Sequence, residues 1–212
     1  MMKNKFIVIE GLEGAGKTHA CLFVKETLKE YNIRNVVLVR QPGSTPIAEK
    51  IRKLIKNEFQ IEKFEKETEL LLMYAARIQL VKKIIQPALK QGKWVISDRH
   101  DLSSFAYQGG GLGIKKKLIQ QLTSLFLGDL MPDLTLYLDV HPKIGLKRAL
   151  KRKKLDRIEH RSLKFFKKTR ISYLKNIKSD KKVIKIDANL NINSVTQNIK
   201  FQILKWLHKK VI

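Results

Sequence analysis

The amino-acid sequence predicts a three-layer α/β domain in which helices flank a five-stranded parallel sheet. Two observations lead to this prediction. Five short segments are apolar throughout rather than alternating, which is typical of strands buried on both faces of a parallel sheet. Helical patterns separate these segments, and polar residues collect where each segment ends, which is the edge at which open α/β sheets bind ligands. No linker or internal repeat divides the 212 residues, so we expect one domain over residues 1–212.

The elements are predicted in the following order. Strands are expected at residues 6–9, 36–39, 94–97, 134–138 and 183–186. Helical periodicity predicts helices at residues 17–31, 47–57, 65–90 and 115–127, and a last amphipathic helix around residues 195–207. Turn residues follow the second strand at 40–43, and three glycines at 109–111 are expected to break the chain before the helix at 115–127.

Composition excludes several classes of protein. Hydrophobic residues make up 43% of the chain, enough for a buried core. No apolar run approaches the ~20 residues of a membrane helix, and the N-terminal residues do not form an export signal. The single cysteine, Cys21, cannot form an internal disulfide. We therefore expect a cytoplasmic protein without a membrane partner.

The chain is strongly basic, with 44 Lys and Arg against 19 Asp and Glu and a formal charge of +25. Such a charge raises nucleic acid as a partner, although lysines on solvated helix faces would produce it without any function. We expect no nucleic-acid partner, because no recognised nucleic-acid motif and no aromatic-rich basic stripe is present. The charge is concentrated at residues 141–185, which contain 13 Lys and 5 Arg. Part of this stretch, about residues 143–161, is predicted to leave the core as a basic lid.

A glycine-rich motif links the first strand to the first helix and matches the pattern G-x-x-x-x-G-K-[ST]. Its glycines let successive backbone N–H groups converge on phosphate oxygens at a helix N-terminus. Lys17 is expected to reach the β- and γ-phosphates, and the Thr18 hydroxyl to ligate Mg²⁺. The motif predicts a P-loop NTPase fold that binds ATP, unless the match is fortuitous or the site lacks turnover. The predicted ATP-binding residues are Gly11, Leu12, Glu13, Gly14, Ala15, Gly16, Lys17 and Thr18.

A second cluster of charges is expected at the same edge of the sheet. Asp98 and Arg99 follow the third strand, and Arg40 follows the second. Two arginines are more than one ATP needs beside Lys17, so the cluster favours a second anionic substrate placed for in-line transfer. The alternatives are a surface ion pair for Asp98–Arg99 and a solvated loop charge for Arg40.

Beyond the phosphate loop, several segments of the chain form a recognisable set. They are Arg40-Gln41-Pro42-Gly43, Tyr74-Ala75-Ala76-Arg77, Asp98-Arg99-His100, Ser104, Ala106-Tyr107-Gln108-Gly109 and Pro132-Asp133-Leu134-Thr135-Leu136-Tyr137-Leu138-Asp139. Together these segments resemble the thymidylate kinase family, and the resemblance runs from Phe6 to Arg170. The chain most resembles the bacterial type, which has no arginine in its phosphate loop and carries its catalytic arginine in the lid.

The resemblance implies ATP-dependent phosphorylation of dTMP to dTDP with Mg²⁺, in dTTP biosynthesis, by a homodimer that pairs through helices. Glu13 would face the deoxyribose 3′-hydroxyl and Tyr107 would exclude a 2′-hydroxyl. The residues implied to bind dTMP are Glu13, Arg40, Met73, Arg77, Arg99, Ser104, Tyr107 and Gln108. Those implied in catalysis are Lys17, Asp98, Arg148, Arg152 and Arg157, and those implied at the metal are Thr18 and Asp98.

Three positions depart from the family pattern. Gln41 stands where a glutamate is usual, Ser44 where a glycine is usual, and Met73 where an aromatic ring usually stacks on thymine. We expect retained activity with weaker dTMP binding, since methionine packs on a ring but lacks a rigid π-face. Two alternatives remain open: a different nucleoside or nucleotide acceptor, and a basic P-loop protein in which ATP gates nucleic-acid binding.

Overall fold

The sheet is all-parallel, as the sequence predicts, and has the strand order β2-β3-β1-β4-β5. The protein is described by a computed structural model that covers residues 4–57, 62, 64–151 and 155–211. The strands are β1 (Phe6–Gly11), β2 (Val36–Arg40), β3 (Trp94–Asp98), β4 (Leu134–Asp139) and β5 (Val183–Asp187). Each strand reaches one or two residues beyond its predicted end, which carries the polar residues to the sheet edge.

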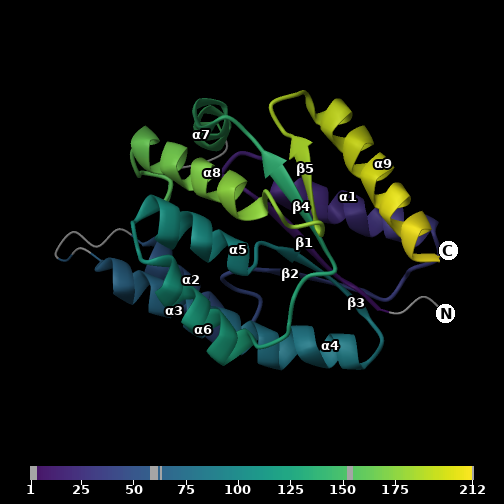
Figure 1. Ribbon diagram of the computed structural model, residues 1–212, viewed down its shortest axis with the longest axis horizontal. Coiled ribbons are helices and arrows are strands. Elements are labelled where there is room, and N and C mark those ends of the chain that lie inside the picture. Colours follow the sequence, from purple (N-terminus) through teal and green to yellow (C-terminus); the bar gives the residue numbers. More distant parts are fainter. Residues whose placement is uncertain (1–3, 58–61, 63, 152–154, 212) are drawn as a thin grey trace.

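The helices surround this sheet (Figure 1). They are α1 (Lys17–Glu30), α2 (Pro46–Lys56), α3 (Lys66–Leu80), α4 (Gln86–Lys90), α5 (Asp101–Ser104), α6 (Lys116–Leu127), α7 (Pro142–Leu150), α8 (Leu163–Ile177) and α9 (Ile192–Val211), with π-helical turns η1 (Val81–Ile85) and η2 (Phe105–Gly111). The predicted helix at 65–90 corresponds to α3, η1 and α4 in succession. The π-helical turn ends two residues before Pro87, which has no N–H to donate to a preceding carbonyl.

Both faces of the sheet are covered, which accounts for its continuously apolar strands. Helices α1 and α9 contact each other on one face, with Val24 and Ile203 in one core cluster with Ile7 and Ile9 of β1 (Figure 1). On the other face, Phe6 and Val8 pack in a second cluster with residues of α3, η1 and α4. Alternate residues of β1 thus serve two cores.

The prediction that the glycines at 109–111 break the chain is wrong. They lie within η2, which continues α5 as a helical segment that the sequence pattern did not indicate. A side chain at Gly110 would collide with Ser172 of α8, and one at Gly111 would collide with Phe165. These glycines therefore allow α8 to pack directly on η2.

None of the described helices has the length and hydropathy that a membrane span requires.

Candidate active site

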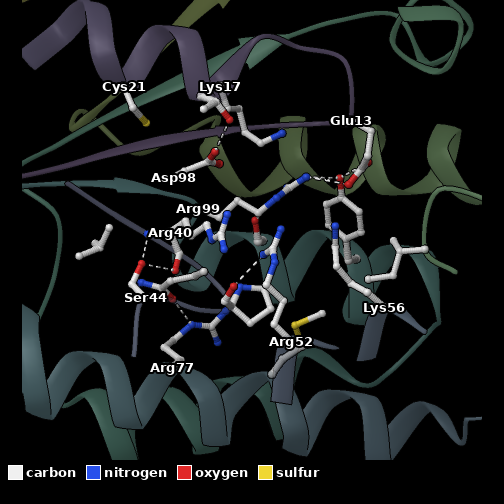
Figure 2. A pocket seen from close by; sticks show the side chains of 18 of the residues that line it. Glu13, Lys17, Cys21, Arg40, Ser44, Arg52, Lys56, Arg77, Asp98 and Arg99 are labelled. Carbon is white, nitrogen blue, oxygen red and sulfur yellow. Dashed lines mark hydrogen bonds and ion pairs between the residues drawn. The ribbon is translucent and has the colours of Figure 1, made fainter. Parts of the chain in front are cut away.

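A cavity of about 560 Å³ opens at the carboxyl edge of the sheet (Figure 2). Its walls come from the loop after β1, from the ends of β2 and β3, from α1, α2, α3, α5 and η2, and from the segment before α8. All eight residues that the family resemblance implies at the acceptor line it: Glu13, Arg40, Met73, Arg77, Arg99, Ser104, Tyr107 and Gln108. So do Gly14, Gly16, Lys17, Thr18 and Asp98 from the predicted donor and metal sites.

The phosphate loop, residues 11–18, curls between β1 and α1. Gly14 has φ of +71° and Gly16 has φ of +89°, conformations that side chains rarely adopt. At the start of α1, the Lys17 ammonium donates to the carbonyl of Leu12 at 2.8 Å. The Thr18 hydroxyl donates to Asp98 at 3.1 Å, which joins the loop to the end of β3.

Lys17 is short of compensating negative charge. Burial, together with the positive charge of Arg99, lowers the pKa of Lys17 to about 8. Asp98 and Glu13 act in the opposite direction without overcoming burial. A bound phosphate would supply the missing charge, so this end of the cavity is suited to an anion.

Arg99 anchors the next part of the cavity. Its guanidinium donates to the carbonyl of Gly11 at 2.9 Å, to Glu13 at 2.7 Å and to the Tyr107 hydroxyl at 3.0 Å. Its backbone has φ of +72°, which for a residue with a side chain costs about 1–3 kcal/mol and persists only when the surroundings impose it. Figure 2 shows Asp98 between Lys17 and Arg99.

Buried Glu10, at the end of β1, holds the segment that carries Arg99. Its carboxylate accepts the backbone N–H groups of His100 and Ser103 at 2.8 and 3.2 Å, and the hydroxyl of Tyr173 at 2.8 Å. Burial raises the pKa of Glu10 despite these donors and the nearby Arg99. Sequence reasoning missed this residue, because an acidic residue inside an apolar strand gives no indication of its partners.

Arg40 lies at the open side of the cavity. It forms two bonds of 3.0 Å to the carboxylate of Glu49 on α2, and its backbone N–H donates to the Ser44 hydroxyl. Ser44 has φ of +68°, a left-handed backbone that favours the glycine usual at this position in the family. The serine hydroxyl contributes a hydrogen bond that glycine could not make.

Arg77 is buried in the wall of the cavity, and Gln41 helps to hold it. The Arg77 guanidinium donates to the side-chain oxygen of Gln41 at 2.9 Å, to Asp101 at 3.1 Å and to the Ser104 hydroxyl at 2.9 Å. The negative charge that a glutamate at position 41 would bring comes instead from Asp101. The amide nitrogen of Gln41 donates to Nδ1 of His100 at 2.9 Å.

Two further cations in the cavity were not identified from the sequence. Arg52 and Lys56 line it together with Glu49, and all three lie on α2 (Figure 2). Arg52 donates to the carbonyl of Pro42 at 2.7 Å, and Lys56 pairs with Asp156 at 2.5 Å. Their spacing of three and four residues places them on one face of the helix that follows Arg40, and that spacing could have revealed them.

Two of the predicted lid arginines, Arg148 and Arg157, do not line the cavity in this structure. Arg148 donates to the carbonyls of Ala188 and Asn189 at 2.6 and 3.0 Å, in the loop after β5. Arg157 donates to the carbonyl of Ile55 at 2.7 Å and to a carboxylate of α3. Arg152 lies outside the described residues.

A phosphate loop and an arginine-lined compartment that share one cavity define a P-loop kinase of the nucleoside monophosphate class. The sequence model of the family described as "Thymidylate kinase" matches residues 9–199. A thymidylate kinase of Buchnera aphidicola subsp. Schizaphis graminum is 80% identical over 212 residues, all of both chains. The chain belongs to the thymidylate kinase family.

More distant relatives agree. A thymidylate kinase of Vibrio parahaemolyticus is 50% identical over 210 residues, which is 99% of this chain and 100% of the relative. The crystal structure of a thymidylate kinase from Ehrlichia chaffeensis superposes with a TM-score of 0.75 at 31% identity, over 97% of this chain and 100% of that one. The predicted fold class and family are therefore confirmed.

Proposed function

We propose that the chain transfers the γ-phosphoryl group of ATP to the phosphate of dTMP, with ATP on the phosphate loop and dTMP in the cavity beside it. An oxygen of the dTMP phosphate attacks the γ-phosphorus, and the bond from γ-phosphorus to the bridging oxygen breaks to release ADP. The observation that carries this arrangement is the position of Arg99, which touches both the loop carbonyl of Gly11 and the acceptor compartment. Catalysis then consists mainly of alignment and neutralisation of charge.

The cations divide between the two substrates. Lys17 and the loop N–H groups serve the triphosphate, whereas Arg40, Arg52 and Arg99 surround the site of the acceptor phosphate. Asp98 lies between the two groups (Figure 2). Its carboxylate offsets part of the repulsion between Lys17 and Arg99.

Thr18 and Asp98 are suited to hold Mg²⁺. Their oxygens lie 3.1 Å apart beside the phosphate loop. Within the described residues no cluster of three acidic, histidine or cysteine side chains exists, which fits an ion that takes its other ligands from phosphate and water. When bound, Mg²⁺ neutralises charge on the β- and γ-phosphates.

The base would lie against Met73, with Arg77 and Gln108 at its hydrogen-bonding edge. The Arg77 guanidinium has five N–H groups. Four of them donate hydrogen bonds, to Gln41, Asp101, Ser104 and the His100 carbonyl. The fifth can donate to a carbonyl of the base, as thymine requires.

Glu13 and Tyr107 form the wall at the sugar. The Tyr107 hydroxyl donates to Glu13 at 2.5 Å, which fixes the ring in place. A fixed ring leaves no room for an additional 2′-hydroxyl, while the Glu13 carboxylate can accept the 3′-hydroxyl. This assignment accounts for a preference for deoxyribose.

Residues 143–161 would form the lid over the donor. In a catalytic role, Arg148 would exchange its carbonyl partners for the transferring phosphoryl group on closure, and Arg157 would exchange a carbonyl and a carboxylate. We also propose a homodimer that pairs through α3 and α6, where Leu71 is 56% exposed and Leu125 is 73% exposed.

The Arg99→Lys variant tests the acceptor site. Lysine keeps the charge but cannot make the three contacts of the guanidinium, so the dTMP KM is expected to rise at least about tenfold. Steady-state kinetics with dTMP, dUMP, UMP, dCMP and thymidine, with the product identified by chromatography, measure this and establish the acceptor. Arg34→Lys, at an exposed position outside the cavity, is the control. A dTMP KM unchanged in Arg99→Lys, or thymidine as the best acceptor, contradicts the proposal.

A further inference from the structure

Glu69 is a buried carboxylate at the back of the acceptor compartment. It lies in the first turn of α3 and is 1% exposed, although glutamate is rarely buried without partners. Three side chains donate to it: Gln108 at 2.9 Å, Arg157 at 2.6 Å and Arg161 at 2.5 Å. Two of these donors come from the segment before α8 and one from η2, so Glu69 connects three parts of the chain.

One carboxylate oxygen of Glu69 determines how the Gln108 side chain lies. This oxygen accepts the amide N–H of Gln108, and a carboxylate can only accept. The amide therefore turns its nitrogen to Glu69, and no donor among the described residues takes its carbonyl oxygen. Because Gln108 lines the cavity, that carbonyl is available to an N–H group of a bound base.

The other oxygen of Glu69 holds the segment from 155 to 161 against the cavity. Besides its bond to Glu69, Arg157 donates through its side chain to the Ile55 carbonyl and through its backbone to the Lys56 carbonyl. Neighbouring residues of the same segment, Asp156 and Ile158 among them, form part of the cavity wall. Glu69 thus contacts Gln108, the residue proposed to bind the base, and also Arg157 in the C-terminal part of the proposed lid.

Charge makes Glu69 hard to replace. Two guanidinium groups converge on one carboxylate in a region where both arginine side chains are 17% exposed. Nη1 of Arg161 is buried and finds no hydrogen-bond acceptor within the described part of the chain. A neutral side chain at position 69 would leave both cations without their shared counter-charge.

We propose that Glu69 is a positioning residue that sets acceptor-base selectivity through Gln108. With the amide nitrogen held by Glu69, the site offers an acceptor to the base at this point. Thymine and uracil present an N–H there, whereas cytosine presents a lone pair and is repelled. The inference rests on the proposed acceptor site, in which Gln108 contacts the base.

The Glu69→Gln variant tests the proposal with dTMP and 5-methyl-dCMP, two acceptors that share the methyl group and differ at the hydrogen-bonding edge. A glutamine at position 69 can donate or accept, so Gln108 can present either end of its amide. We expect the ratio of kcat/KM for dTMP over 5-methyl-dCMP to fall about tenfold, the effect of one hydrogen bond. Glu67→Gln, on the exposed side of the same helix, is the matched control.

A double-mutant cycle separates positioning from a purely structural role. If Glu69 acts through Gln108, then Glu69→Gln changes the selectivity ratio in the wild-type background but not in Gln108→Ala. Multiplicative effects of the two changes on that ratio overturn the proposal. Thermal unfolding and circular dichroism establish that each variant is folded.

Glu69→Asp keeps the charge opposite the two arginines and withdraws the carboxylate by one carbon, so the test survives if Glu69→Gln does not fold. Wild-type selectivity in a folded Glu69→Asp or Glu69→Gln overturns the proposal. If Gln108→Ala lowers the selectivity and the Glu69 variants do not, only the role of Glu69 fails. If Gln108→Ala itself leaves selectivity unchanged, the proposed base contact fails and the inference with it.

Discussion

Gln41 and His100 form a buried hydrogen bond that supports Arg77. Burial and the adjacent positive charge of Arg77 lower the pKa of His100 to about 4, so its ring is neutral at pH 7. A neutral ring can accept at Nδ1, which is where the Gln41 amide donates. A glutamine at position 41 therefore satisfies both neighbours, because its carbonyl oxygen accepts from Arg77 and its amide nitrogen donates to His100.

Gln41→Glu should reverse the charge preference of His100. A carboxylate beside the ring stabilises the imidazolium and raises the pKa of His100. In the wild type, the unfolded chain binds more protons than the folded one between pH 4 and 6.5, so stability rises with pH across that window. The His100 contribution to the free energy of unfolding should differ by about 2 kcal/mol between pH 5 and pH 7, and the variant should lose this difference. Urea denaturation at both pH values measures it, and an equal pH dependence in both proteins contradicts the account.

Lys17 should couple ATP binding to proton uptake. With its pKa lowered to about 8, Lys17 is largely neutral at pH 9 in the free protein, whereas a triphosphate favours the charged form. The ATP dissociation constant should therefore rise above pH 8, by at most about tenfold per pH unit. Calorimetry at pH 7 and pH 9 in buffers of different ionisation enthalpy measures the uptake, and Lys17→Met should abolish both the linkage and turnover. Proton-independent binding at pH 9 would refute the assignment.

Helix α7 meets the phosphate loop through glycine on both sides. A side chain at Gly14 would collide with the backbone of Gly145, and one at Gly145 would collide with the carbonyl of Glu13. The backbone of α7, in the N-terminal part of the proposed lid, is therefore in direct contact with the backbone of the phosphate loop. Neither glycine alone indicates this in the sequence, because the contact joins positions that are far apart in the chain.

Gly145→Ala should weaken use of ATP. Within a helix, alanine is intrinsically favoured over glycine by about 0.5–1 kcal/mol, so any loss of stability comes from the collision. We expect a loss of about 1–3 kcal/mol, the usual range for overpacking, and a lower kcat/KM for ATP as the loop is displaced. Thermal unfolding and kinetics measure both, with Lys147→Ala on the exposed face of α7 as control. Wild-type stability and kinetics would show that the contact is dispensable.

Elements with a clear period could be predicted from the sequence, and those defined by tertiary contact could not. The strands and the helices α1, α2, α3, α4, α6 and α9 were predicted to within a few residues, because each has a simple apolar pattern, whereas no helix bounds were predicted for α7 or α8. The segment α5–η2 was missed, since its glycines are selected for the approach of α8 and resemble a turn. The partners of Arg148 and Arg157 could not be predicted either, because the sequence of a basic stretch does not indicate which backbone carbonyls its arginines will contact.

For the whole molecule, the order of apolar strands and the phosphate-loop motif were enough to predict the sheet and its functional edge. The acceptor side chains were placed through the family resemblance, and the cavity brings all eight of them together. The spacing of Arg52 and Lys56 on α2 was an unused signal in the sequence, whereas Glu69 required the three-dimensional packing of α3.

Leu125→Lys should dissociate the proposed homodimer. Leu125 on α6 is 73% exposed, and the neighbouring α3 exposes Leu71. A charge in an apolar interface carries a desolvation cost that an exposed surface does not. Analytical ultracentrifugation should find a dimer for the wild type and a monomer for the variant, with Leu150→Lys, on the exposed end of α7, unchanged. A monomeric wild type contradicts the proposal.

The arginines that await the acceptor phosphate are already occupied by carboxylates of the protein. Glu49 pairs with Arg40 and Glu13 pairs with Arg99, so the protein's own carboxylates occupy the positions where the phosphate of the acceptor would pair. The guanidinium groups therefore do not drive one another apart before the nucleotide arrives, and they need no reordering when it does. When the acceptor binds, its phosphate would take the place of these carboxylates on arginines that are already in position.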